Sequence, residues 1–169
     1  MSVAEKMAQD PGAEAGAELK PHYLEALKLV ERLHRCLLDV IKDEFDRAGQ
    51  SEINSVQALL LFNIGPSELT AGELRTRGHY LGSNVSYNLK KLVDAGYINH
   101  QRSDMDRRSV RVSLTEKGHE VRRRIDDLYQ RHIRSVEEVG EISLDHFVAL
   151  NDSLRKLERF WTDQIRYRL

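Results

Sequence analysis

This chain of 169 residues has one cysteine, three prolines, one tryptophan and a net charge of only −1. The single Cys36 excludes an internal disulfide and a cysteine cluster for zinc. No apolar run approaches the roughly 18 residues needed to cross a bilayer, and the N-terminus has no apolar signal core. We therefore expect one cytoplasmic domain in a reducing compartment, with no membrane partner. Because the overall charge is near zero, any surface for nucleic acid must be local.

Motifs of the common enzyme classes are missing as well. The sequence contains no Walker-A loop, nucleophile elbow, zinc-protease helix or dinucleotide fingerprint. Its seven histidines do not fall at metal-ligand spacing, although distant histidines could still meet in the fold. We therefore predict that the protein is not an enzyme and has no cofactor and no metal.

The middle of the chain predicts a winged helix-turn-helix over about residues 50–114. Thr70 and Glu73 form a T-x-x-E capping box for one short helix, and Ser83 is the expected cap of a second helix that runs to about Ala95. Period-2 strands follow at residues 97–102 and 109–114, joined by a polar loop. Two helices followed by such a hairpin are typical of a winged helix.

Long helices are predicted on both sides of this unit. Residues 1–20 are rich in Ala, Gly and Glu without an apolar stripe, which predicts a flexible arm. A helix is expected from Pro21 to about residue 48, and Ser55 is expected to cap a short apolar helix over residues 56–64. Two more helices should follow, one capped by Thr115 and running to about residue 136, and one from Ser143 to about residue 167.

These elements predict a mainly α protein with a small β wing (α+β), with residues 21–169 forming a single domain. The long helices, at about residues 21–48 and 115–167, carry more apolar surface than the winged unit can cover. Stripes left over in this way usually close on a partner chain, so we predict an intertwined homodimer.

Positive charge is concentrated in the winged unit. Residues 72–111 contain eight Lys and Arg against four Asp and Glu, a local net charge of +4 on a chain of net charge −1. In the second helix Val85, Leu89 and Leu92 share one side, which leaves a polar, cationic face toward solvent. The predicted DNA contacts on this face and the preceding helix are Ser83, Asn84, Ser86, Tyr87 and Asn88 at base edges, and Lys90, Lys91, Arg75 and Arg77 at phosphates.

The loop between the two strands ends in a pair of arginines. Arg107 and Arg108 at a hairpin tip can enter the minor groove, whose negative potential attracts guanidinium groups. Asp106 or Asp104 can hold one of these arginines in a fixed rotamer. The alternative is that both the loop and the helix face are merely solvated. An arginine pair at a wing tip favours DNA binding over the other alternative, a winged-helix module that docks proteins and binds no DNA.

These motifs together resemble the MarR family of winged-helix transcription regulators. The resemblance covers nearly all of the chain after the arm, and its strongest marks are GSNVSYNLKKLVDAGYI and DMDRRSVRVSLTEKG. Within the family the sequence is most similar to the LdtR group, which implies control of cell-wall L,D-transpeptidase or stress genes. The resemblance implies a dimer on a pseudo-palindromic operator, repression in most members, and release by a small, often aromatic ligand.

An effector cleft of this family would be lined from the first, second and fifth helices. The candidates are His34, Leu37, Leu38, Phe62 and Tyr129, each of which is equally a core or dimer residue. Cys36 lies in an apolar stretch, so we expect a buried, inert thiol there, with a bridge between two subunits as the alternative.

Overall fold

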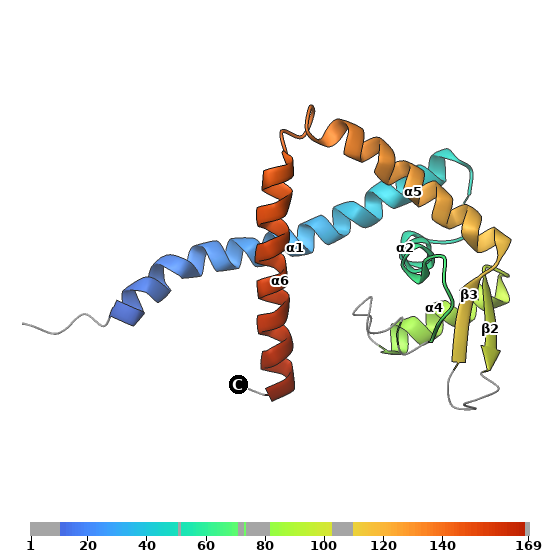
Figure 1. Cartoon of the computed structure of the whole chain (residues 1–169), viewed down its shortest axis with the longest axis horizontal. Coiled ribbons are helices and arrows are strands. Elements are labelled where there is room, and N and C mark those ends of the chain that lie inside the picture. The colour runs from blue at the N-terminus through green and yellow to red at the C-terminus, as the bar shows by residue number, and fades with distance from the viewer. Residues whose placement is uncertain (1–10, 51, 71–72, 74–81, 103–109, 168–169) are drawn as a thin grey trace, which may run out of the picture.

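The computed structural model describes residues 11–50, 52–70, 73, 82–102 and 110–167, and it leaves the side chains of residues 11–15, 82–85, 102 and 110 outside the description. Five helices and three short strands are assigned (Figure 1): α1 Pro11–Arg47, α2 Ser55–Ile64, β1 Leu69–Thr70, α4 Gly82–Asp94, β2 Ile98–Arg102, β3 Val110–Leu114, α5 Glu116–Val136 and α6 Leu144–Tyr167. The predicted fold class, mainly helical with a small β wing, is confirmed.

The hydrophobic core lies in a lobe built from the C-terminal end of α1, α2, α4, the sheet and the first half of α5. α2 is apolar on almost every side and packs against both α1 and α5. Figure 1 shows α2 at the centre of this lobe. Fully burying one such aliphatic side chain contributes about 1.5–3 kcal/mol. The largest side chains with almost no exposure are Ile41, Leu60, Leu61, Ile64, Leu92, Val112 and Ile125.

The three strands form one antiparallel sheet in the order β1-β3-β2. β2 and β3 occupy the positions that the sequence predicts, with His100 opposite Val112, and Val112 also faces Leu69 of β1. β1 was not predicted, because two residues are too few to show the alternation that marks a strand. The sheet packs on α2 and α5 through its buried side chains, and it sits beside α4.

The first helix begins ten residues earlier than predicted. α1 starts at Pro11, so residues 11–20 are helical, and Pro21 lies inside the helix rather than at its start. Pro11 fits the first turn of a helix, where its missing N–H is not needed. The segment lacks an apolar stripe, but its Ala, Glu, Leu and Lys residues favour a helix by intrinsic propensity. The part of the predicted flexible arm at residues 1–10 lies outside the described residues.

The caps of α2, α5 and α6 agree with the predictions to within one residue, whereas the start of α4 does not. Asn54, and not Ser55, caps α2. Its side chain accepts from the Gln57 N–H at 2.9 Å, and its own N–H donates to Gln57 Oε1 at 3.1 Å. α4 begins at Gly82, so Ser83 lies inside the helix and the prediction that it caps α4 is wrong. Thr115 caps α5 as predicted, accepting from the Gly118 N–H at 3.2 Å. α6 begins at Leu144, directly after Ser143.

α1 and α6 leave the lobe and cross one another (Figure 1). Trp161 of α6 donates its indole N–H to the Tyr23 hydroxyl of α1 at 3.2 Å. Cys36 is exposed on α1, so the expectation of a buried thiol is wrong for the single chain. The face of α1 that packs on the lobe carries Ile41 and Phe45, and Cys36 lies off that face. Among the described helices, none is long and apolar enough to span a membrane.

Candidate nucleic-acid interface

α4 is held against the lobe by its apolar side and by the way its C-terminal end is closed. Leu89 and Leu92 are buried, as the helical phase predicts. Gly96 takes a positive φ of 76°, which L side chains rarely adopt, and its N–H donates to the Val93 carbonyl at 3.0 Å. The Tyr97 N–H donates to the Leu92 carbonyl at 2.9 Å. This pair of bonds is a Schellman motif, and it fixes where the helix ends and β2 begins.

The opposite face of α4 is polar and faces solvent. Ser86, Lys90 and Lys91 are exposed, and Tyr87 keeps 63% of its surface accessible. The Lys91 ammonium nitrogen lies 5.8 Å from the centroid of the Tyr87 ring, within cation–π range. Asn88 is half-buried. A helix with this face can place hydroxyl and phenol groups at base edges and ammonium groups at phosphates.

Figure 1 shows α4 and the β2–β3 hairpin side by side on one side of α2, with α5 on the other side of α2. The predicted base-reading side chains Ser83 and Asn84 lie in the first turn of α4, where side chains are outside the description. The predicted phosphate contacts Arg75 and Arg77 and the wing-tip residues also lie outside the described residues, the latter being Asp104, Asp106, Arg107 and Arg108. Their contact with DNA stays a prediction.

Two side-chain contacts fix the chain around β1. Arg111 of β3 donates to a carboxylate oxygen of Glu68 at 2.9 Å, just before β1, which ties the base of the wing to the neighbouring strand. Thr70 and Glu73 form the predicted capping box, with the Thr70 N–H donating to Glu73 Oε2 at 2.7 Å and the Glu73 N–H donating to Thr70 Oγ1 at 3.1 Å. The segment that leads toward α4 therefore starts from a defined point.

A junction that sequence reasoning missed joins three elements beside the end of α4. The Lys117 ammonium donates to Glu52 Oε2 at 2.8 Å and lies 4.2 Å from the centroid of the Tyr97 ring. The Tyr97 hydroxyl donates to the same carboxylate oxygen at 3.0 Å. The hydrogen bonds from Lys117 and Tyr97 lower the pKa of Glu52. Burial, followed by the bond to Glu52, raises the pKa of Tyr97. We call these three residues the Lys117 junction.

The first turn of α5 approaches the end of α4 very closely. The Thr115 hydroxyl donates to the Gly96 carbonyl at 2.7 Å, and the Thr115 N–H donates to the Tyr97 carbonyl at 3.1 Å. A Cβ placed on Gly118 would lie 2.3 Å from the Tyr97 carbonyl oxygen, far inside contact distance. Only glycine allows this approach, so the T-x-x-G sequence of residues 115–118 is a packing signature.

The predicted effector residues lie partly in the core. Phe62 and Tyr129 pack edge to face, with ring centroids 5.2 Å apart, and both are half-buried against the core together with Leu37. Leu38 is half-buried and His34 is exposed. The contacts of Phe62, Tyr129 and Leu37 are those of packed core residues, and a role in ligand binding stays a prediction.

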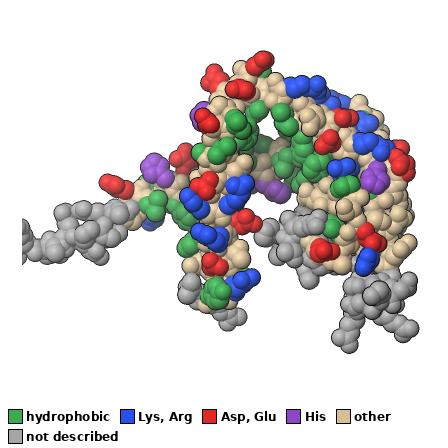
Figure 2. All heavy atoms as spheres, in the orientation of Figure 1, with side chains coloured by type: hydrophobic (Ala, Val, Ile, Leu, Met, Phe, Trp, Pro, Cys, Tyr) green, Lys and Arg blue, Asp and Glu red, His purple; other side chains and the backbone are tan. Residues whose placement is uncertain are grey.

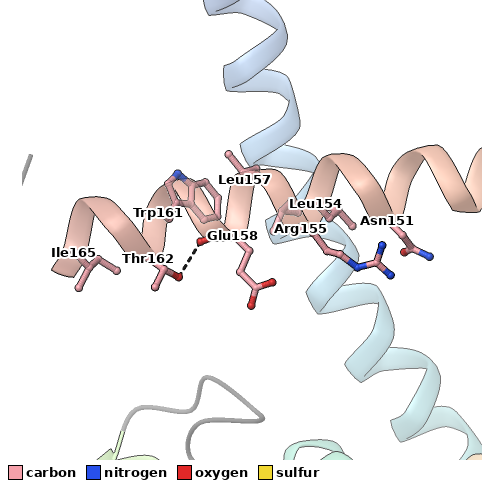
Figure 3. A pocket seen from close by; sticks show the side chains of 9 residues that line it. Asn151, Leu154, Arg155, Leu157, Glu158, Trp161, Thr162 and Ile165 are labelled. Atoms are coloured by element: carbon pink, nitrogen blue, oxygen red, sulfur yellow. Dashed lines mark hydrogen bonds between the residues drawn. The ribbon is translucent and has the colours of Figure 1, made fainter. Parts of the chain in front are cut away.

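A cavity of about 470 Å³ lies where α6 crosses α1. Figure 3 shows its side chains projecting mostly from α6, with Trp161 and Leu157 beside the α1 ribbon. Val30 closes the α1 side. Its lining is largely apolar, with the ring of Trp161 and the side chains of Leu154, Leu157 and Ile165 among it.

Exposed apolar side chains are frequent on α1 and α6. Figure 2 shows them on α6 and on the part of the lobe that faces it across a hollow. No residue of α6 is buried within the described part of the chain. The exposed apolar residues of these two helices include Leu19, Leu24, Leu29, Val30, Leu33, Val40, Leu144, Val148, Leu150, Leu154, Phe160 and Ile165. Exposed apolar side chains in this number on two crossing helices are typical of an interaction surface.

Groups that bind metals do not gather in the described residues: no three His, Cys, Asp or Glu side chains are placed to hold an ion.

Comparison with known proteins agrees with this geometry. A family model described as a winged helix DNA-binding domain matches residues 53–118. The chain is 34% identical over 145 residues to the exopolysaccharide II synthesis transcriptional activator ExpG of Rhizobium meliloti, a match that covers 86% of this chain and 74% of that protein.

Solved structures share the fold. Streptococcus pneumoniae FabT in complex with DNA matches with a TM-score of 0.65 at 20% identity, covering 83% of this chain and 98% of FabT. AbsC of Streptomyces coelicolor, a MarR family transcriptional regulator, matches with a TM-score of 0.64 at 19% identity, covering 82% of this chain and 93% of AbsC. A mutant of E. coli MarR complexed with operator DNA also matches at 0.64, with 17% identity, covering 80% of this chain and 95% of that one.

Proposed function

The chain belongs to the MarR family of winged-helix transcription regulators, and from this premise we propose that it binds a pseudo-palindromic operator in double-stranded DNA as a homodimer. The protein is a transcriptional regulator with a DNA-binding winged helix. Each protomer would place one α4 in the major groove, and two protomers related by a two-fold axis would read half-sites about one helical turn apart.

The outward face of α4 carries this proposal. Leu89 and Leu92 pack α4 against the lobe, so the helix holds Tyr87, Lys90 and Lys91 in a defined position on its outward face. Two ammonium groups and a phenol on one face suit a polyanion with readable edges. A protein-docking module has no need of this cationic face, and the DNA named in the FabT and MarR complexes supports the DNA reading.

The dimer is supported by the surface of α1 and α6. α6 has no buried residue of its own, and an apolar cavity of about 470 Å³ opens at the crossing of the two helices. Water would be in contact with this surface in a single chain, whereas a second copy would cover it. Because a two-fold interface uses the same patch on both protomers, one apolar face is enough to build it.

The sign and the control of regulation form the finer part of the proposal. We propose repression, since occluding a promoter needs only the DNA contacts, while activation also needs a surface for the polymerase. ExpG is described as an activator. If transcription of a reporter gene behind the operator rises when this protein is expressed, the protein is an activator, and the proposal of DNA binding is unaffected. Release by a small aromatic ligand near Phe62 and Tyr129, control of cell-wall L,D-transpeptidase or stress genes, and a cytoplasmic location are proposed from the family resemblance.

Selection of bound sequences from a random duplex library tests the proposal. The full-length protein should enrich a pseudo-palindrome whose half-site centres lie about 10–10.5 base pairs apart or a multiple of that spacing. If the folded, dimeric protein enriches no sequence motif at moderate salt, the alternative of a winged-helix module that docks proteins and binds no DNA would be supported instead.

A further inference from the structure

Lys117 contacts two segments that are distant from it in sequence, one at Glu52 and one at residues 95–97. Its ammonium nitrogen lies 2.8 Å from Glu52 Oε2, 3.4 Å from the Ala95 carbonyl oxygen and 4.2 Å from the centroid of the Tyr97 ring. Glu52 and Lys117 are 65 positions apart. An ammonium group has three donors on a flexible stem, so one lysine can serve the carboxylate and the carbonyl together.

These two segments and Lys117 itself belong to different parts of the proposed DNA-reading unit. Glu52 lies in the connection from α1 to α2, and Lys117 lies in the first turn of α5. Both α1 and α5 lead into the part of the chain that we assign to the dimer. Ala95 and Tyr97 follow α4 directly, at the point where the Schellman motif closes the DNA-reading helix. The junction is therefore where the reading helix meets the frame that carries it.

We propose that Lys117 is a positioning residue that, through Glu52, Ala95 and Tyr97, sets the angle at which α4 is held on the frame formed by α1 and α5. This inference rests on the proposed function, because the angle matters only if α4 reads DNA. In a dimer the same angle is set twice, so the two junctions fix the relative orientation of both reading helices.

The chemistry at the end of α4 favours a cation supplied from another element. The last carbonyls of a helix carry a partial negative charge, and a positive group near them is stabilising. Lys117 supplies that charge from α5, so the favourable interaction depends on the relative placement of α4 and α5. The ring of Tyr97, which is buried, forms the platform beneath the ammonium group.

Positioning and stability are separable here because Lys117 and Glu52 are largely exposed, with 45% and 69% of their side chains accessible. Ion pairs of this kind contribute little to folding. A small cavity of about 220 Å³, lined in part by Gln50 and Glu120, lies beside the junction. Replacing Lys117 should therefore leave the fold intact and change where α4 points.

The test compares three variants of the full-length dimer with the wild type. Lys117→Met keeps the aliphatic stem and removes the charge, Glu52→Gln removes the carboxylate, and Lys117→Arg keeps a cation. Glu116→Gln is the matched control, because it breaks an exposed 2.8 Å ion pair to Arg123 that lies wholly within α5.

Two readouts are needed. Operator affinity should fall by about fivefold to twenty-fivefold in Lys117→Met and Glu52→Gln, since an exposed pair changes an equilibrium by up to about fivefold and the operator engages two protomers. Affinity for random duplex should change less than about twofold in these variants, and Lys117→Arg should regain most of the operator affinity. Glu116→Gln should behave as wild type in every measurement.

Amide hydrogen exchange of the free dimer provides the second readout. Amides of residues 92–97 should exchange at least about threefold faster in Lys117→Met than in Glu116→Gln, with the rest of the lobe unchanged. Equal exchange at these amides in the two variants, or equal proportional losses on operator and random DNA, would overturn the inference. If the wild type fails to discriminate between the two duplexes, the proposed function fails, and the exchange result still decides whether Lys117 holds α4.

Discussion

The winged lobe and the crossing helices α1 and α6 both contain many apolar side chains, but only the lobe buries them. The lobe covers its apolar side chains within one chain, with Ile41, Leu61 and Ile125 fully buried, whereas α6 has none buried and exposes Leu150, Leu154 and Ile165. The lobe therefore has a complete core, whereas the apolar surface of α1 and α6 is left uncovered. In the proposed dimer, each chain would therefore supply one contact with DNA, and the second copy would set the spacing between the two contacts.

The largest effect is expected from a charge placed where α1 and α6 cross. Leu154→Glu places a carboxylate in the lining of the α1–α6 cavity, and a buried unpaired charge costs several kcal/mol per copy. We expect the dimer dissociation constant to rise by at least about a thousandfold, measured by sedimentation equilibrium. Lys156→Glu is the control, since Lys156 pairs with Asp152 on an exposed part of α6. A Leu154→Glu protein that remains a tight dimer would remove α6 from the interface.

A cavity in the lobe core should instead affect folding within each chain. Leu61→Ala in α2 should lower the free energy of unfolding by about 2–5 kcal/mol in a denaturant titration, because Leu61 is fully buried and its truncation would leave a cavity in the core. Leu61→Met conserves volume and should cost less than about 1.5 kcal/mol. Similar small losses from both variants would mean that the lobe is less tightly packed than the structure indicates.

Two glycines sharpen the contrast further. Gly118→Ala forces a Cβ against the Tyr97 carbonyl and should destabilise the protein by about 1–3 kcal/mol, despite the better helix propensity of alanine. Gly16 lies in α1, and a Cβ there would meet no atom of another part of the chain within 4 Å, so Gly16→Ala should stabilise by about 0.5–1 kcal/mol. Thermal unfolding of both variants measures this, and a neutral Gly118→Ala would show that α5 does not need its close approach to the Tyr97 carbonyl.

The smallest expected effect concerns pH. The hydrogen bonds from Lys117 and Tyr97 lower the pKa of Glu52 below its ordinary value of 4.5. A carboxyl with a lowered pKa in the folded state contributes stability above its unfolded pKa, and this contribution is lost as pH falls through the folded value. The difference in unfolding free energy between wild type and Glu52→Gln should therefore be full near pH 6 and should shrink below about pH 4.5. A difference that stays constant from pH 6 to pH 3 would contradict the junction's ionic character.

Hydrophobic periodicity and capping residues predicted the elements whose signals lie within a short stretch of sequence. The apolar phase of Leu89 and Leu92, the alternation in β2 and β3 and the Thr115 cap were each visible in a short window, and the structure agrees with them. The start of α1 was wrong because propensity alone, without an apolar stripe, sustains residues 11–20 as helix. β1 was too short to give a pattern.

Contacts between distant segments left little trace in the sequence. Glu52 meets Lys117 across 65 positions, and only the folded chain brings them together. The Gly118 in T-x-x-G was the one local sign that α5 approaches another backbone closely at this corner. Cys36 was misjudged because an apolar stretch on a long helix has two sides, and the side that this chain leaves uncovered cannot be identified from composition. The roles of the wing-tip arginines and of the effector residues stay predictions.

The outward face of α4 is tested most directly by measuring affinity for operator and random duplex against salt concentration for two double variants. The double variant Lys90→Ala with Lys91→Ala should bind both duplexes more weakly. The slope of log affinity against log salt should become shallower by up to about 3.6, because two phosphate contacts would be lost in each protomer at about 0.9 per contact. Ser86→Ala with Tyr87→Ala should reduce operator affinity by tenfold or more while leaving the slope and random binding nearly unchanged. Unchanged slopes in the first variant, together with unchanged discrimination in the second, would contradict the account that this face reads DNA.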